Sequence, residues 1–454
     1  MSRLFARNAL LPGGWRRDVL LGWDADGTLT EVRENAGADG VPVVEYVLPG
    51  MVNLHSHAFQ RALGGLAERA GPGPDSFWTW RDLMYRFAAT ITPEQVQAIA
   101  AQLFSECLRH GYTALCEFHY IQRRPGGSAY ASTAEMAERV AAAAQESGIG
   151  ITLLPVLYSH AGFGGQALRP EQGRFRTDAQ DVLEIIAALE GLRSGQLEVG
   201  AAPHSLRAAG VKQIHELVHG LPAGRPLHIH VAEQQAEVEQ SLAFSGQRPV
   251  EYLLAHVEID ARWCLVHATH LTLAESAQLA ASGAVAGLCP TTEANLGDGL
   301  FALAPYIGAG GAFGIGSDSH VSHSPVEELR WLEYGQRLVG QRRNVAATAT
   351  LPDVGAFLWQ GALHGGARAS GRPVGALAVG KRADLLVLDD AHVNLAGADA
   401  AEVMGRFLFC GNDNLVRDVL VGGRWVVKNG MHFDQNAIAH RYKLALHELR
   451  EVSR

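Results

Sequence analysis

The segment LPGMVNLHSH, residues 48–57, is an apolar run that ends in two histidines, His55 and His57. A short apolar run that follows a Pro-Gly pair is typical of a buried strand. Side chains alternate across a strand, so the two histidines face the same way at its end. Two imidazoles directed at one point can chelate a metal ion, although polar residues also end strands without that role.

Further apolar segments of this kind follow through residues 50–374, where they alternate with helical stretches. One helix is marked by Thr92, Pro93 and Gln95, which predict a capping box, and by Gly111 after its end. Eight strands alternating with helices favour a (β/α)8 barrel, although the count alone leaves a doubly wound sheet open. The predicted strand ends carry further polar residues: Glu117, His119, His160, His204, His230, Glu233, His267, His270, Asp318 and His320.

Both ends of the chain differ from this middle part. Residues 1–49 and 375–454 contain short strands and tight turns, such as the hairpin predicted at DADG, residues 24–27. We therefore expect two domains. Residues 1–49 with 375–454 form a small, discontinuous β-sandwich, and residues 50–374 form the barrel.

The composition is typical of a globular protein and argues against a nucleic-acid partner, a membrane span and disulfide bonds. The 454 residues are 47% hydrophobic and 19% charged, with a net charge of −9, and no run of Lys or Arg stands out, so we expect no nucleic-acid partner. The basic start lacks the apolar core of a signal peptide, and no apolar run approaches the ~18 residues of a membrane span. The 5 irregularly spaced cysteines favour reduced thiols in a cytoplasmic protein.

A second H-x-H motif lies in HIHVAE, residues 228–233, and Glu233 follows its second histidine, His230, by three positions. A carboxylate next to a metal ligand can take a proton from an activated water and pass it to a leaving group. His267 ends another predicted strand, and Asp318 ends the segment GIGSDSH. Aspartate suits a hard divalent ion, so these strand ends together predict a metal-dependent hydrolase.

The order H-x-H, H-x-x-E, His and Asp resembles the amidohydrolase superfamily, in its aminohydrolase branch of cytosine, guanine and adenosine deaminases. The resemblance implies proton transfer by Glu233, polarisation of the reacting centre by His267 and a catalytic role for Asp318. No lysine follows the fourth strand in GAAPHSLRA, residues 200–208, which disfavours a two-metal hydrolase. The resemblance implies one divalent ion, expected to be Zn²⁺, with the ligands His55, His57, His230 and Asp318.

Longer stretches are similar to the formimino-glutamate deiminases of this branch, over essentially the whole chain. They include GMVNLHSHAFQRALGGLAE, SFWTWRDLMYRF, HIHVAEQ and CPTTEANLGDG. This resemblance implies hydrolysis of N-formimino-L-glutamate to N-formyl-L-glutamate and ammonia in histidine degradation. It also implies a homodimer.

A substrate with two carboxylates needs cations in its pocket, and arginine binds carboxylate with two parallel hydrogen bonds. Arg81 and Arg207 are the candidates, although Arg81 could instead pair with Asp82 or cover aromatic surface, and Arg207 could cap a helix. The resemblance adds three residues, so the predicted substrate-binding set is Gln60, Arg81, Tyr120, His204 and Arg207.

Two other functions stay open. A guanine or other nucleobase deaminase would use the same chemistry, but a neutral base does not need the arginines. A metal-binding scaffold without activity is disfavoured because every ligand and shuttle position is filled. We expect His119, His228, His270 and His320 to pack or to support the site residues, although the role of His320 stays open because it stands beside Asp318. Glu293 and Asn295 are left without a role.

Overall fold

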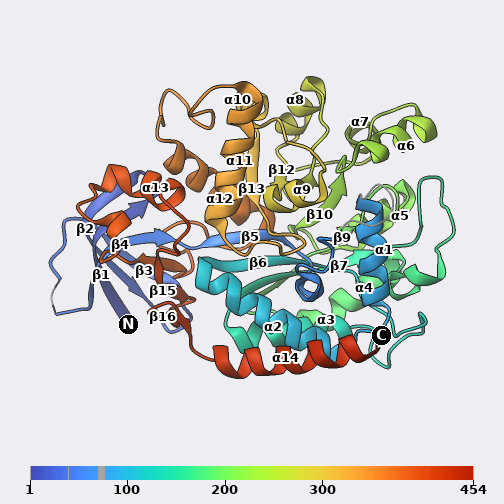
Figure 1. Ribbon diagram of the computed structural model, residues 1–454, viewed down its shortest axis with the longest axis horizontal. Coiled ribbons are helices and arrows are strands. Elements are labelled where there is room, and N and C mark those ends of the chain that lie inside the picture. The colour runs from blue at the N-terminus through green and yellow to red at the C-terminus, as the bar shows by residue number, and fades with distance from the viewer. Residues whose placement is uncertain (1, 39, 70–76, 453–454) are drawn as a thin grey trace.

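The computed structural model describes residues 2–38, 40–69 and 77–452, and Figure 1 shows their path. Two parallel sheets from the middle of the chain are joined by bridges from Ser56 to Asp318 and from Ala201 to Leu227. They therefore close into the predicted eight-stranded barrel, whose fourth strand is interrupted. The strands are β5 (Met51–Ser56), β6 (Tyr112–His119), β7 (Gly150–Leu157), β8 (Leu197–Val199) with β9 (Ala202–Pro203), β10 (Leu227–Val231), β11 (Trp263–His267), β12 (Val285–Leu288) and β13 (Ala312–Ile315).

Helices follow the barrel strands, as the sequence predicts. In α2 (Pro93–His110) the capping box forms, because Thr92 accepts the Gln95 N–H and Gln95 Oε1 accepts the Thr92 N–H. Gly111 ends the helix at φ 104°, in the left-handed region that favours glycine. The other helices of this part are α1 (Phe77–Ala88), α3 (Glu135–Ser147), α4 (Ala179–Leu189), α5 (Val211–Gly220), α6 (Gln235–Ser245), α7 (Pro249–His256), α8 (Leu273–Ser282), α9 (Pro290–Leu296), α10 (Leu303–Gly308), α11 (Pro325–Gly340) and α12 (Val354–Ser370), with the 3₁₀ turns η1 (Ala58–Leu63), η2 (Pro170–Phe175) and η3 (Glu190–Leu192).

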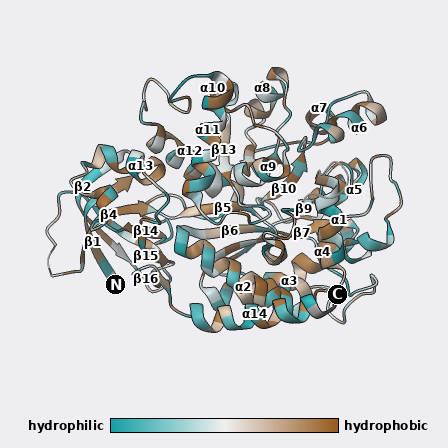
Figure 2. Ribbon diagram, in the orientation of Figure 1, coloured by the Kyte–Doolittle hydropathy of each residue, from teal (hydrophilic) through white to brown (hydrophobic). Residues whose placement is uncertain are grey.

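The barrel strands are buried on both faces, which explains their nearly continuous apolar sequences. Figure 2 shows the hydrophobic colour along these central strands and more hydrophilic colour on outer helices. Polar residues are placed mainly where the strands end, and this is the edge that carries the candidate site.

The two ends of the chain form one further sheet. β4 runs parallel to β1 and antiparallel to β14, so it joins the amino-terminal strands to the carboxy-terminal ones. The sheet order is β17-β16-β15-β14-β4-β1-β2-β3. Its members are β1 (Ser2–Leu11), β2 (Gly14–Trp23), β3 (Leu29–Arg33), β4 (Val43–Pro49), β14 (Leu385–Leu388), β15 (Val416–Val421), β16 (Arg424–Lys428) and β17 (Met431–His432).

This sheet curls back on itself. Trp23, at the end of β2, donates its indole N–H to the Gly423 carbonyl at 3.2 Å, although three strands separate β2 from β15 in the sheet order. The curled sheet encloses its own apolar core, in agreement with the predicted β-sandwich. That core includes Leu4, Val19, Leu21, Trp23, Leu29, Val47, Leu385 and Leu420.

Three more elements complete the carboxy-terminal part: η4 (Val393–Leu395), α13 (Ala400–Phe409) and α14 (Gln435–Val452). α14 leaves the terminal sheet and lies along α2, where Gln95 donates to Glu448 at 3.0 Å (Figure 1). The domain limits at residues 49 and 375 stay a prediction. The five cysteines are free, and none of the helices in the described part of the chain is long and apolar enough to cross a membrane.

Candidate active site

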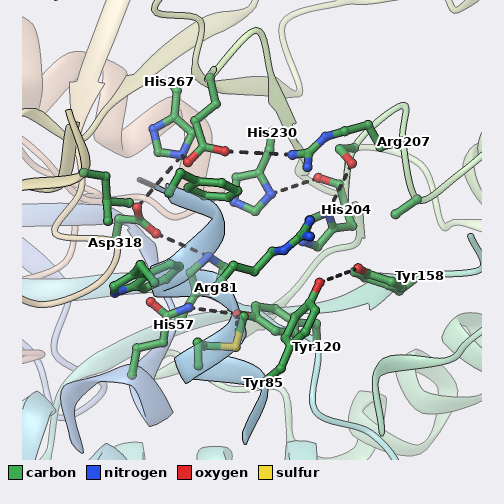
Figure 3. Close-up of a pocket in the computed structure, with 18 of the residues that line it drawn as sticks. His57, Arg81, Tyr85, Tyr120, Tyr158, His204, Arg207, His230, His267 and Asp318 are labelled. Atoms are coloured by element: carbon green, nitrogen blue, oxygen red, sulfur yellow. Dashed lines mark hydrogen bonds and ion pairs between the residues drawn. The ribbon is translucent and has the colours of Figure 1, made fainter. Parts of the chain in front are cut away.

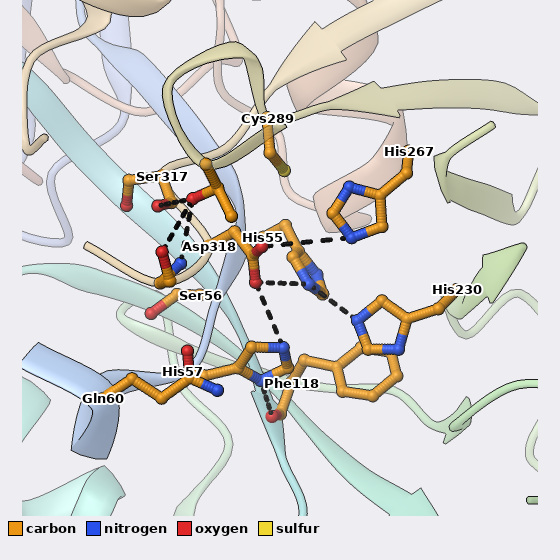
Figure 4. Close-up of polar contacts among 12 residues, drawn as sticks. His55, Ser56, His57, Gln60, Phe118, His230, His267, Cys289, Ser317 and Asp318 are labelled. Carbon is orange, nitrogen blue, oxygen red and sulfur yellow. Dashed lines mark hydrogen bonds and ion pairs between the residues drawn. The ribbon is translucent and has the colours of Figure 1, made fainter. Parts of the chain in front are cut away.

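The carboxyl ends of the barrel strands bring five side chains to one point (Figure 4). His55 belongs to β5 and His57 follows that strand, while His230 belongs to β10, His267 ends β11 and Asp318 follows β13. All five are buried, with at most 5% of each residue exposed. Residues far apart in sequence thus form one compact polar cluster.

The donor atoms of this cluster are closely spaced. Nε2 of His55 and Nε2 of His57 each lie 3.3 Å from Oδ1 of Asp318. Nε2 of His230 lies 2.9 Å from Nε2 of His55. Ligand atoms about 2.0–2.1 Å from a tetrahedral zinc ion lie roughly 3.3 Å from one another. The spacing therefore fits a single ion of this kind.

Backbone carbonyls orient two of the imidazoles. Nδ1 of His57 lies 2.8 Å from the carbonyl oxygen of Phe118, and Nδ1 of His230 lies 2.9 Å from that of His204. A carbonyl only accepts, so each Nδ1 carries the proton and each Nε2 presents a lone pair to the shared point. Burial lowers the pKa of both histidines, which keeps the rings neutral and able to bind a cation.

The backbone around the cluster is strained. His267 has φ 66° and Asp318 has φ 46°, in the left-handed region that non-glycine residues seldom adopt. Glycine is required at position 316, because a Cβ on this residue would lie 2.7 Å from the Cβ of His55.

The Asp318 carboxyl group is ionised by its surroundings. Burial alone would raise the pKa of Asp318, but the hydrogen bond with His55 and the nearby imidazoles hold this pKa below its usual range.

Glu233 lies beside this cluster. Its Oε1 is 3.7 Å from Nε2 of His267, and its Oε2 is 3.9 Å from Nη2 of Arg207. Burial raises the pKa of Glu233 to about 7. A carboxyl group with a pKa near neutrality can both accept and return a proton. The geometry therefore suits a proton shuttle.

A pocket opens above the cluster, between the barrel and α1 (Figure 3). Gln60 and Tyr120 lie on its wall, where the Gln60 amide donates to the Tyr120 hydroxyl at 2.8 Å. The wall also contains aromatic side chains from α1, including Trp80 and Tyr85. All five side chains predicted to contact substrate line this pocket: Gln60, Arg81, Tyr120, His204 and Arg207.

Arg81 lies on α1, with its guanidinium carbon 4.3 Å from the centre of the Trp78 ring. The sequence left open a pair between Arg81 and Asp82. Instead, Asp82 lies 3.7 Å from Nη2 of Arg169. Arg81 thus lies in the pocket wall and covers aromatic surface, the other role that the sequence left open, without Asp82 as its partner.

Arg207 is almost fully buried, with 10% of its side chain exposed. Burial alone would lower its pKa, but Glu237 and Glu233 raise it, so the guanidinium keeps its charge. The helix cap considered as an alternative role belongs to another residue, because the Gly210 N–H donates to Gln213 at 3.1 Å. Arg207 is therefore a buried cation beside Glu233 in the wall of the pocket.

Comparison with known proteins places these residues in a family. A family model described as the amidohydrolase family matches residues 46–426. The chain belongs to the amidohydrolase family. A second model, described as the N-terminal domain of formimidoylglutamate deiminase HutF, matches residues 1–41. The amidohydrolase match spans all the strands that carry the site.

Individual relatives agree with this assignment. The chain is 52% identical to a formimidoylglutamate deiminase of Pseudomonas aeruginosa, over 99% of this chain and 100% of the relative. A crystal structure of an amidohydrolase from Brucella melitensis superposes with a TM-score of 0.94 at 45% identity, covering 99% of this chain and 100% of the other. A zinc-bound adenosine deaminase from Xanthomonas campestris has a TM-score of 0.80 at 22% identity, covering 99% and 98%, and shows the shared fold.

Other polar residues of this amidohydrolase brace the strands. Nε2 of His228 lies 2.8 Å from the Ala369 carbonyl in α12. The His320 ring lies 2.9 Å from the Ser317 hydroxyl and 3.3 Å from the Ser56 hydroxyl. These contacts suit the supporting role expected for His228, and they show that His320, whose role the sequence left open, contacts the hydroxyl groups of Ser317 and Ser56. His119 and His270 lie outside the residues that line the pocket.

The two residues left without a role lie in different places. Asn295 is exposed, and its side-chain amide donates to Glu68 at 2.8 Å. Glu293 is buried, and its Oε1 lies 3.3 Å from Nδ1 of His267. This contact could not be predicted from the sequence, because it joins a residue of α9 to the end of β11. The only signal was an acidic residue placed shortly after an apolar segment.

Proposed function

We propose that this amidohydrolase hydrolyses N-formimino-L-glutamate to N-formyl-L-glutamate and ammonia, as a step in histidine degradation. The observation that carries the proposal is the buried cation of Arg207 in the same pocket as the His/Asp cluster and Glu233. The 52% identity to the Pseudomonas formimidoylglutamate deiminase over the full length of both chains supports it.

In this proposal one divalent ion, Zn²⁺, binds to His55, His57, His230 and Asp318. The support is the 3.3 Å spacing of the His55, His57 and Asp318 atoms and the outward-facing Nδ1 protons of His57 and His230. The bound ion supplies Lewis acidity, which makes a water molecule nucleophilic near neutral pH.

The side chains around the ion carry out the proton transfers. Water adds to the formimino carbon and the C=NH nitrogen leaves as ammonia, so both protons of the water must move to that nitrogen. Glu233 accepts each proton in turn and delivers it to the nitrogen before ammonia leaves. His267 hydrogen-bonds the reacting centre through Nε2, the atom that faces Glu233 and lies 3.9 Å from Asp318.

The rest of the pocket selects the substrate. Arg207 and Arg81 bind the two carboxylates, since an unpaired carboxylate in a buried pocket is strongly unfavourable. Gln60, Tyr120 and His204 complete the contacts with the substrate. We further propose a homodimer in the cytoplasm, where the five free thiols stay reduced.

Ammonia release from a panel of substrates tests the proposed function. The panel contains N-formimino-L-glutamate, N-formimino-L-aspartate, guanine, cytosine and adenosine. N-Formimino-L-glutamate should give the highest kcat/KM. Faster turnover of guanine or another base would favour a nucleobase deaminase, and no release from any member would favour an inactive metal-binding scaffold.

A further inference from the structure

Glu293 contacts His267 on the side of the ring that faces away from Glu233. Its Oε1 lies 3.3 Å from Nδ1 of His267, whereas Nε2 of that ring lies 3.7 Å from Glu233 and 3.9 Å from Asp318. Both residues of this contact are buried, with 3% of Glu293 and 1% of His267 exposed. The His267 ring is thus held between carboxylates.

A carboxylate at Nδ1 determines both the tautomer and the orientation of an imidazole. Oε1 of Glu293 accepts the Cys289 N–H, so this oxygen is an acceptor and its contact with His267 requires a proton on Nδ1. A ring flip would place carbon atoms against Glu293 and would lose the bond. The contact therefore selects the one ring position in which Nε2 faces the pocket. The backbone of His267 is itself strained, at φ 66°, a conformation that persists only where surrounding contacts hold the residue in place.

From this geometry we infer that Glu293 is a positioning residue, which fixes the His267 ring with Nε2 directed at the reacting centre. The inference deepens the proposed function and rests on it for the role of His267. It assigns Glu293 no contact with the substrate.

Helix capping is the competing role. Glu293 lies in the first turn of α9, and its Oε1 also accepts the Cys289 N–H at 2.9 Å. One oxygen atom serves both donors, so this carboxylate connects the start of α9 to the ring of His267. A cap alone would affect stability, whereas a positioning residue would also affect the chemical step.

Two substitutions separate these roles. Glu293→Ala removes the acceptor for both donors and should lower kcat by roughly 10–100-fold with KM changed less than about 3-fold, as for other groups that orient a functional histidine. Glu293→Gln keeps an oxygen that can accept both hydrogen bonds and should retain activity within about 10-fold of wild type. The control is Gln213→Ala, which removes a comparable side-chain cap from α5 and should leave kcat unchanged.

The ¹⁵N NMR signals of the His267 ring provide a second readout that needs no substrate. They are assigned in histidine-labelled protein by comparison with His267→Gln. Wild type and Glu293→Gln should show a hydrogen-bonded proton on Nδ1, and in Glu293→Ala the Nδ1 signal should shift because that hydrogen bond is lost. If Glu293→Ala does not fold, Glu293→Asp replaces it in both measurements, since the shorter side chain withdraws the carboxylate from the ring.

Three results would overturn the inference: a Glu293→Ala kcat within twofold of wild type, an equal loss in the Gln213→Ala control, or identical His267 signals in wild type and Glu293→Ala. Failure of the proposed function looks different. In that case wild type releases no ammonia from N-formimino-L-glutamate, while the NMR comparison still reports on the contact between Glu293 and His267.

Discussion

Glu233 is the single residue on which the proposed chemistry depends most, because it has no role as a proposed metal ligand. Glu233→Gln keeps the size of the side chain but removes its ability to take a proton. We expect kcat to fall by ~10²–10⁴-fold, the usual range for a general acid–base group, with unchanged metal content. Ammonia release and elemental analysis of the purified variant measure the two quantities. A kcat within a few-fold of wild type would exclude this role.

Arg207 should determine the preference for an acidic substrate. A charge-assisted hydrogen bond contributes about 1.5–3 kcal/mol, so Arg207→Met should lower kcat/KM for N-formimino-L-glutamate by roughly 10–100-fold. Arg207→Lys should recover only part of this loss, because lysine keeps the charge but not the two parallel hydrogen bonds.

A substrate that lacks one carboxylate provides the control for Arg207. N-Formimino-γ-aminobutyrate lacks the α-carboxylate, and its counterpart with a truncated side chain lacks the other one. Arg207→Met should cause little further loss on the compound without the carboxylate that Arg207 binds. An equal loss on both truncated compounds and on the full substrate would mean that Arg207 supports the fold instead.

At the level of elements, the end of β5 depends on β6. Glu117 of β6 accepts the Ser56 hydroxyl at 2.6 Å and the Ala58 N–H at 2.7 Å, on either side of His57. Glu117→Gln presents an amide N–H to one of these donors and should disturb the strand end. Partners of this kind typically change metal affinity by about 10–100-fold. Competition with a chelator measures the affinity, and wild-type affinity in the variant would contradict this support role.

The sequence predicted these elements unequally well. The capping box of Thr92 and Gln95 depends on residues three positions apart, and the polar strand ends follow from alternation along each strand, so both were visible in the sequence. The contact of Glu293 with His267 was not, because it depends on how α9 is placed against the end of β11. Site residues that belong to a local sequence motif were therefore easier to predict than residues such as Glu293, which orient a site residue from another element.

For the whole molecule, the assembly of one sheet from both ends could be predicted from their similar strand-and-turn pattern. The curl of that sheet could not, since it depends on contacts such as that of Trp23 with Gly423, which are 400 residues apart. The packing of α14 along α2 was also unforeseen. Its polar residues gave no indication of which helix it would meet.

The stability of the whole molecule should decrease in mild acid. His323 lies 3.6 Å from Glu106 of α2, and burial lowers its pKa from 6.5 to about 4. Between these values the unfolded chain binds a proton that the folded protein does not, so stability is full above pH 6.5 and is lost as the pH falls toward 4. The loss should reach about 3 kcal/mol at most.

Denaturant unfolding at several pH values checks this effect. His323→Gln removes the titrating group, so its stability should depend less on pH than that of wild type between pH 6.5 and 4. His219→Gln, at an exposed position of α5, is the control and should behave like wild type. Equal pH dependence in wild type and His323→Gln would show that other groups account for the loss.

The identity of the products tests the central claim most directly. Purified protein is incubated with N-formimino-L-glutamate, and the products are quantified before and after treatment with a chelator and after addition of Zn²⁺. We expect ammonia and N-formyl-L-glutamate in equal amounts, loss of both with the chelator and recovery with Zn²⁺. Release of formamide and glutamate, which requires cleavage of the other C–N bond, or full activity after complete metal removal, would contradict the proposed reaction.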